Sequence, residues 1–260
     1  MSDRAIPLWS AREKTRRPRL LVCLTLCSSI AAPFPIYAEM PRPRPALATP
    51  TEAATAPAHP HAARLEEDLT QRPKSAAALL ARLARMPGFA AHFEETKKIS
   101  LLTTPLVSRG ELFFDPPDRL LRRTQSPSEQ RVLVDGDRVV LIDATRREEL
   151  DLGSDTPIRP LVASLLWVLA GEREPLERSY RVDYTLDPDG RAWALRLVPR
   201  TAPLDALIAA IEVRGVSALP TEFRVEEANG DLSITRLSEL DTERRFTASE
   251  QSSLFDSEAP

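Results

Sequence analysis

The stretch Leu79–Asp143, LLARLARMPGFAAHFEETKKISLLTTPLVSRGELFFDPPDRLLRRTQSPSEQRVLVDGDRVVLID, decides the fold class. Leucines and Met86 recur every three or four residues at its start, within an amphipathic helix expected over 75–86 that Pro87-Gly88 ends. From Phe89 onward, apolar and polar residues alternate, which predicts half-buried strands. Almost none of these side chains is suited to chemistry. The stretch therefore predicts a protein that works through an apolar surface rather than through catalysis.

Further strands follow, separated by one apolar helix. Asp135-Gly136-Asp137, Asp187–Gly190 and Asn229-Gly230 are turn sequences between alternating runs. Residues 157–170 are apolar around most of a helical circumference, which indicates a helix covered on both faces, and Gly171 is placed to cap it. Strands are expected over 89–94, 106–115, 119–125, 130–134, 138–143, 146–152, 180–186, 191–198, 206–214, 221–227 and 231–237.

Hairpin-linked strands with two helices predict an α+β fold built on a large antiparallel sheet. Such a sheet must cover its apolar face by closing on itself or by packing helices across it. The chain has eight glycines, and most of them fall at predicted turns or helix ends. Since no glycine cluster is present to bind a phosphate, a nucleotide-binding loop is not expected.

The N-terminus has the pattern of a secretory signal peptide. Residues 12–19 contain five basic side chains, and the apolar run Leu20–Ala32 that follows is too short to span a bilayer comfortably. We expect a signal peptide over residues 1–38 with cleavage after Ala38, or alternatively after Ala31.

Two other export signals are less favoured. Cys27 is a weak candidate for lipid attachment because a leucine precedes it, and Arg16-Arg17 is a loose match to a twin-arginine signal because a proline follows it. The two cysteines of the chain, Cys23 and Cys27, both lie in this segment. The mature chain is therefore expected to form no disulfide, thiolate metal site or cysteine nucleophile.

The remaining chain divides into a tether, one domain and a tail. Residues 39–62 are rich in proline, alanine and threonine, which predicts a disordered tether, and we expect a single domain over 63–250 and a flexible tail over 251–260. Residues 1–38 contain six basic and two acidic residues, so their removal changes the formal net charge from −3 to −7. This charge disfavours binding to nucleic acids or to anionic membrane surfaces.

The sequence gives no indication of a catalytic, metal or cofactor site. His92 lies on the polar face of its strand, and no serine and carboxylate motif accompanies it. The pairs Glu94-Glu95 and Glu148-Glu149 could serve as paired carboxylates for glycoside hydrolysis, but adjacent strand residues point to opposite faces. Since Lys97-Lys98 and Arg146-Arg147 lie close by, a solvated, charge-balanced edge is the preferred interpretation. Arg122-Arg123 is open to two interpretations: a surface arginine beside one that caps the sheet rim, or a pair that binds an anionic headgroup.

Aromatic and leucine side chains indicate an internal cavity. Trp167 and Trp193 are either ordinary core residues or part of that cavity. The residues that we expect to line or cover it are Phe93, Leu112, Phe114, Leu121, Leu165, Trp167 and Trp193.

The segments LARLARMPGFAAHFEETK (80–97) and GELFFDPPDRLLR (110–122), and the order of the strands and helix after them, resemble the LolA family of periplasmic outer-membrane lipoprotein carriers over most of 75–240. The resemblance implies an incomplete, half-open antiparallel barrel of roughly ten or eleven strands, with helices covering the concave apolar face as a lid. It also implies a periplasmic monomer without enzymatic activity or cofactor. Such a protein receives an acylated lipoprotein or lipid from an inner-membrane exporter and delivers it to an outer-membrane acceptor.

The chain departs from the family at one position. Family members place an arginine before a proline at the end of the second strand, where it holds the lid shut, whereas this chain has Pro116 there. Arg109 and Arg119 are the candidates to replace that latch. Two alternatives stay open: a carrier of an exported glycolipid, and a non-carrying periplasmic sensor or interaction module on the same fold.

Overall fold

The computed structural model describes residues 73–153 and 159–256. The predicted signal peptide with both cysteines, the predicted tether, the beginning of the predicted domain at 63–72 and the final residues 257–260 lie outside the described residues. Those predictions therefore stay predictions.

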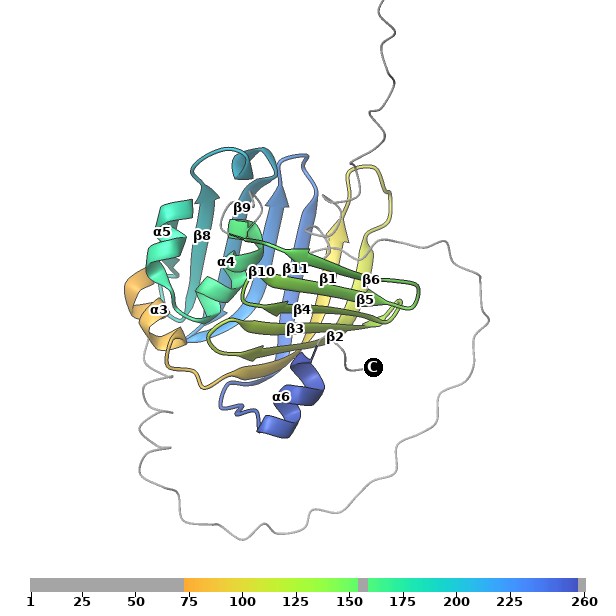
Figure 1. The fold of residues 1–260 in the computed structure, drawn as a ribbon. Coiled ribbons are helices and arrows are strands. Elements are labelled where there is room, and N and C mark those ends of the chain that lie inside the picture. Colours follow the sequence, from red (N-terminus) through yellow and green to blue (C-terminus); the bar gives the residue numbers. More distant parts are fainter. Residues whose placement is uncertain (1–72, 154–158, 257–260) are drawn as a thin grey trace, which may run out of the picture.

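Within this part of the chain, eleven strands form one antiparallel sheet in the order β6-β5-β4-β3-β2-β1-β11-β10-β9-β8-β7 (Figure 1). β1 and β11, from opposite ends of the domain, pair in the middle, while β6 and β7 form the two edges. The half-open antiparallel barrel predicted from the sequence is confirmed. The strands are β1 (Phe89–Lys98), β2 (Leu106–Asp115), β3 (Arg119–Ser126), β4 (Gln130–Asp135), β5 (Arg138–Asp143), β6 (Arg147–Asp151), β7 (Tyr180–Leu186), β8 (Ala192–Pro199), β9 (Ile208–Val216), β10 (Leu219–Glu227) and β11 (Leu232–Asp241).

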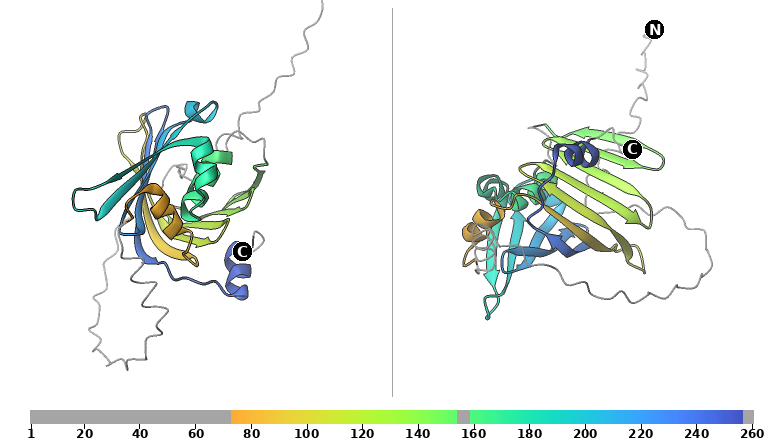
Figure 2. Two further views of the ribbon diagram at one scale, coloured as in Figure 1. Left: turned by 90° about the vertical axis from the view of Figure 1, so that its left-hand side faces the viewer. Right: turned by 90° about the horizontal axis from the view of Figure 1, so that it is seen from below.

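Three helices cover the concave side of the sheet: α3 (Ala76–Leu83), α4 (Arg159–Leu169) and α5 (Arg173–Ser179). α4 lies between the two halves of the curved sheet (Figure 2). Because α4 and α5 follow β6 and precede β7, the segment that joins the two edge strands is also the segment that covers the cavity. The short 3-10 helix η1 (Leu204–Ala206) precedes β9.

The junction between α3 and α4 depends on a glycine. Gly171 follows α4 with a φ of +70°, and a Cβ atom at this position would lie 2.1 Å from the carbonyl oxygen of Leu80. Leu79, Leu80 and Leu83 of α3 are all buried against the same core. The cap predicted at Gly171 therefore also permits the two covering helices to pack closely.

The sheet has apolar side chains on both faces. Successive residues of β3 belong to different clusters: Leu120 lies in the main core on the concave side, and Leu121 lies in a second cluster with Leu133, Val140 and Phe255. This second cluster, which we call the convex cluster, is covered by the C-terminal helix α6 (Ala248–Phe255), on the outside of the barrel (Figure 2).

The prediction of a flexible tail from residue 251 is wrong for residues 251–255. Thr247 and Glu250 form a capping box at the start of α6, and Phe255 is buried at its end. The side chain of Gln251 donates a hydrogen bond of 3.0 Å to the Asp115 carboxylate, which links the helix to the end of β2. Burial of the terminal apolar residues therefore orders this segment.

Candidate functional site

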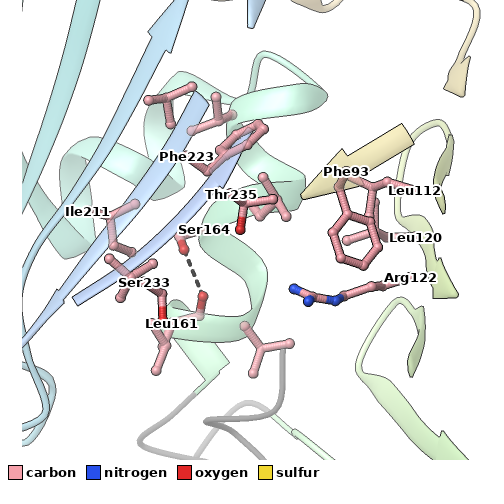
Figure 3. Close-up of a pocket in the computed structure, with 15 residues that line it drawn as sticks. Phe93, Leu112, Leu120, Arg122, Leu161, Ser164, Ile211, Phe223, Ser233 and Thr235 are labelled. Atoms are coloured by element: carbon pink, nitrogen blue, oxygen red, sulfur yellow. Dashed lines mark hydrogen bonds between the residues drawn. The ribbon is translucent and has the colours of Figure 1, made fainter. Parts of the chain in front are cut away.

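A small apolar cavity of about 70 Å³ lies between α4 and the concave face of the sheet (Figure 3). The helix contributes Leu161, Val162, Leu165 and Val168 to its wall. The sheet contributes apolar side chains from both halves, namely Phe93, Leu112, Leu120, Ile211, Val213, Phe223 and Val225. Among the described residues, the polar side chains in the lining are Arg122, Ser164, Ser233 and Thr235.

The structure brings three of the predicted cavity residues together. Phe93, Leu112 and Leu165 line the cavity. Leu165 approaches it from α4, and the other two approach it from β1 and β2.

The other four predicted cavity residues lie elsewhere. Phe114 is buried in the main core, with its ring centroid 5.8 Å from that of Phe89. Trp193 is buried against Gly215 and donates a hydrogen bond of 2.9 Å from Nε1 to the carbonyl of Ser217. Trp167 packs on the main core from α4, and Leu121 points to the convex cluster.

Arg122 lies in the cavity lining, so the first of the two interpretations of Arg122-Arg123, a surface position or the sheet rim, is wrong for this residue. It is 5% exposed, and its Nη2 donates hydrogen bonds to Glu95 Oε2 at 2.7 Å and to Ser108 Oγ at 3.3 Å. Its guanidinium carbon lies 4.2 Å from the centroid of the Phe93 ring, a distance at which a cation and an aromatic face attract each other. The side chain points into the space between the sheet and α4 (Figure 3).

The neighbouring charged residues lie on the opposite face of the sheet. Arg123 pairs with Glu111, and Glu94 pairs with the exposed Arg109 at 2.8 Å. Successive strand residues point to opposite faces, so each doublet has one buried member and one that faces outward. The solvated edge predicted for Glu94-Glu95 is therefore wrong for Glu95. Alternation groups Arg122 with Leu120 and Thr124, but Leu121 makes the face of Arg123 equally apolar, so the sequence has no local signal that places Arg122 inside.

Among the described residues, neither latch candidate has a hydrogen bond or ion pair with the covering helices. Arg109 donates a hydrogen bond of 2.8 Å from Nε to Glu94 Oε2 on the neighbouring strand β1. Arg119 pairs with Asp115 and lies 5.4 Å from the ring centroid of Phe255, on the side of α6.

Two polar contacts instead hold the start of α4. Arg159 donates from Nε to Asp137 Oδ1 at 2.6 Å, which joins the helix to the turn between β4 and β5. The buried Tyr180 donates from its hydroxyl to the carbonyl of Pro160 at 2.9 Å, which joins the helix to the first residue of β7. The first turn of α4 is thereby tied to both halves of the sheet.

The remaining candidates for chemistry are ordinary surface groups. His92 Nε2 lies 3.6 Å from Glu239 Oε2, and both side chains are largely exposed. Glu148 pairs with Arg146, and Glu149 pairs with Arg138. Within residues 73–153 and 159–256, no group of three or more histidine, cysteine, aspartate or glutamate side chains could hold a metal ion.

The fold and the cavity define a class: half-open barrels with an apolar cavity beneath a helical cover. Residues 70–245 match the model of the family described as outer membrane lipoprotein carrier protein LolA-like, and the chain belongs to this family. In the described part of the chain, no helix has the length and apolar character needed to cross a membrane.

Solved structures of similar proteins share little sequence with this chain. A LolA superfamily protein from Nitrosomonas europaea is 10% identical, with a TM-score of 0.39, over 67% of this chain and 96% of that one. The complex of MucA and MucB from Pseudomonas aeruginosa gives 18% identity and a TM-score of 0.39 over 67% of this chain and 59% of the matched one. The Mycobacterium tuberculosis lipoprotein LppX gives 13% identity and a TM-score of 0.32 over 66% and 99%. A comparison with curated proteins gives no match.

Proposed function

We propose that this protein is a periplasmic carrier that shields the acyl chains of a lipoprotein or lipid on the way from the inner to the outer membrane. The observation that supports this most is the apolar cavity beneath α4, together with membership of the LolA-like family. The proposed partners are the acylated cargo, an inner-membrane exporter and an outer-membrane acceptor. An exported glycolipid is an alternative cargo with the same acyl chains.

The free energy of hydration explains why such a carrier needs an enclosed site. At ~0.8 kcal/mol per methylene group, a sixteen-carbon chain left in water costs on the order of 12 kcal/mol. The cavity of about 70 Å³ is too small for that chain, because even a cavity of about 150 Å³ holds only a molecule the size of benzene. We therefore infer that the structure is a closed form and that α4 moves away from the sheet when cargo binds.

Native mass spectrometry of the full chain, exported to the periplasm and purified from there, tests the proposal. We expect a population with the added mass of a lipid or an acylated peptide, and uptake of a fluorescent fatty acid after that lipid is removed. A protein with no added mass that also takes up no fatty acid would contradict the carrier function.

The small volume of the cavity also favours a second candidate function. A protein whose cavity stays filled by its own side chains would serve as a sensor or interaction module that binds another protein through its surface. In that case, the protein would bind a periplasmic partner with the same affinity whether or not an acyl ligand is present.

A further inference from the structure

The concave face of the sheet changes from apolar to charged within a few residues. Along β1, Phe89, Ala91 and Phe93 are buried and apolar, and the next two residues with the same orientation are the buried Glu95 and Lys97. Because a strand rises ~3.3 Å per residue, successive residues on this face, such as Phe93 and Glu95, lie about 7 Å apart along the strand. An elongated ligand under α4 therefore meets an apolar and a polar region of one surface.

Neighbouring strands continue the polar region in register. Glu95 lies between Ser108 of β2 and Thr235 of β11, and Lys97 lies beside Ser233 of β11. Thr235 and Ser233 also line the cavity. The polar region is thus a block across three paired strands and not a single misplaced side chain.

The charges in this block balance. Arg122 pairs with Glu95 at 2.7 Å, and Lys97 pairs with Glu227 at 2.9 Å. All four side chains are less than a tenth exposed. A ligand carboxylate next to Arg122 would lie close to the carboxylate of Glu95, where the low dielectric strengthens repulsion. A neutral hydrogen-bond acceptor meets no such repulsion and suits this site better.

We infer that Arg122, positioned by Glu95 and Phe93, binds the ester or amide carbonyl at the head of an acyl chain whose tail occupies the apolar part of the cavity. This inference rests on the proposed function and narrows its cargo to acyl chains with a neutral head, which excludes free fatty acids as the preferred ligand. Arg122 is the only basic side chain among the described residues that line this cavity. An acyl group attached through an ester or amide, as on a lipoprotein or a lipid, has this chemistry.

Competition binding with the full chain tests the inference. In this assay a naphthylamine dye is first bound in the cavity, and methyl laurate, laurate or dodecane is then added to displace it. The three competitors share a twelve-carbon chain and differ at the head. Since hydrogen bonds to charged groups contribute most, we expect methyl laurate to bind about tenfold more tightly than dodecane. We also expect it to bind more tightly than laurate.

The double variant Glu95→Gln/Arg122→Met removes the ion pair without leaving a buried charge unpaired, which would be strongly destabilising. We expect it to bind dodecane normally and to lose the tenfold preference for methyl laurate. Arg123→Met, on the opposite face, is the matched control and should keep the preference. If the double variant does not fold, Arg122→Lys decides the matter, because it keeps a cation opposite Glu95 but lacks the planar guanidinium, and we expect its preference to fall at least threefold.

An unaltered preference in the folded Arg122 variants, an equal loss in Arg123→Met, or tighter binding of laurate than of methyl laurate would overturn the inference while leaving the carrier function intact. One further result would contradict both this inference and the proposed carrier function. If neither methyl laurate nor dodecane displaces the dye from the unaltered protein, the cavity does not take acyl chains at all.

Discussion

At the scale of single residues, the close packing of α3 on α4 is most sensitive to substitution at Gly171. Its φ is +70°, and an added Cβ would lie 2.1 Å from the Leu80 carbonyl oxygen. We expect Gly171→Ala to lower the free energy of unfolding by about 2–4 kcal/mol, through backbone strain and overpacking together. Denaturant unfolding followed by circular dichroism measures this.

Gly230 provides the control for that substitution. Its φ is also positive, at +89°, but a Cβ there would meet no atom within 4 Å. Gly230→Ala should therefore show the backbone cost alone, about 1 kcal/mol. Equal losses of stability in the two variants would contradict the close contact between α3 and α4.

Asp143 is the residue whose titration is most clearly altered by its surroundings. Hydrogen bonds from the Thr145 side chain, and further bonds from the Thr145 and Arg146 backbone and the Arg146 side chain, lower the pKa of Asp143 from 3.8 to about 2. Because the pKa is lower in the folded protein, the stabilisation is present above pH 3.8 and is lost as the pH falls through about 2. We expect Thr145→Ala to raise the pKa of Asp143 toward 3.8 in an NMR titration, and a value near 3.8 in the unaltered protein would contradict the structure.

The arginine doublet shows what could be predicted at this scale. Alternation predicts that Arg122 and Arg123 point to opposite faces of β3, but it does not say which face is buried. That depends on Glu95 and Ser108, which lie on two other strands and neutralise and bond the guanidinium. The sequence around Arg122 does not indicate which residues of other strands will bond to it, so its position in the interior was not predicted.

At the scale of elements, α6 stabilises the outside of the barrel. Phe255 is 5% exposed and lies edge-on to Phe246, with ring centroids 5.3 Å apart. We expect Phe255→Ala to cost about 3 kcal/mol of stability and to expose the convex cluster, which lowers solubility. Ser253→Ala, at an exposed position of the same helix, should change the stability by less than about 0.5 kcal/mol. If Phe255→Ala lowered the stability as little as Ser253→Ala, this would contradict the packing of α6 on the convex cluster.

The two short helices were missed for a physical reason. α5 and α6 have seven and eight residues, and α6 is mostly polar, so neither has an apolar stripe long enough to identify. The Thr247–Glu250 capping box was the local signal for α6. By contrast, α3, α4 and the strands have strong periodicity or turn signals, and these elements were predicted with ends within four residues of the observed ones. The largest differences are at the ends of β1 and β11, which continue to Lys98 and Asp241.

The start of α4 is the element end that we expect to control access to the cavity. Tyr180→Phe removes the hydrogen bond to the Pro160 carbonyl and should destabilise the closed position of α4 by about 1 kcal/mol. We therefore expect faster uptake of a fluorescent fatty acid in stopped-flow measurements. Tyr184→Phe is the matched control, because the Tyr184 hydroxyl bonds to Pro73 before α3 and not to α4. Equal acceleration in both variants would contradict a specific role of the Tyr180 contact.

At the scale of the whole molecule, the topology explains why a cavity and its cover occur together. The chain leaves the sheet at one edge, β6, crosses the concave face through α4 and α5, and returns at the other edge, β7. The sequence predicted the sheet, the helix and the apolar character of the site. The volume of the cavity could not be predicted, because it depends on how side chains from six strands and α4 fit together.

The most direct test of the account is to fix α4 against the sheet and measure ligand uptake. In a chain with Cys23 and Cys27 changed to serine, Asp137→Cys and Arg159→Cys replace the contact between α4 and the β4–β5 turn, and a short bismaleimide can link them. We predict that the linked protein takes up a fluorescent sixteen-carbon fatty acid at least tenfold more slowly than the same variant left unlinked. Uptake at the same rate and to the same extent in both forms would contradict a carrier whose cavity opens by movement of α4.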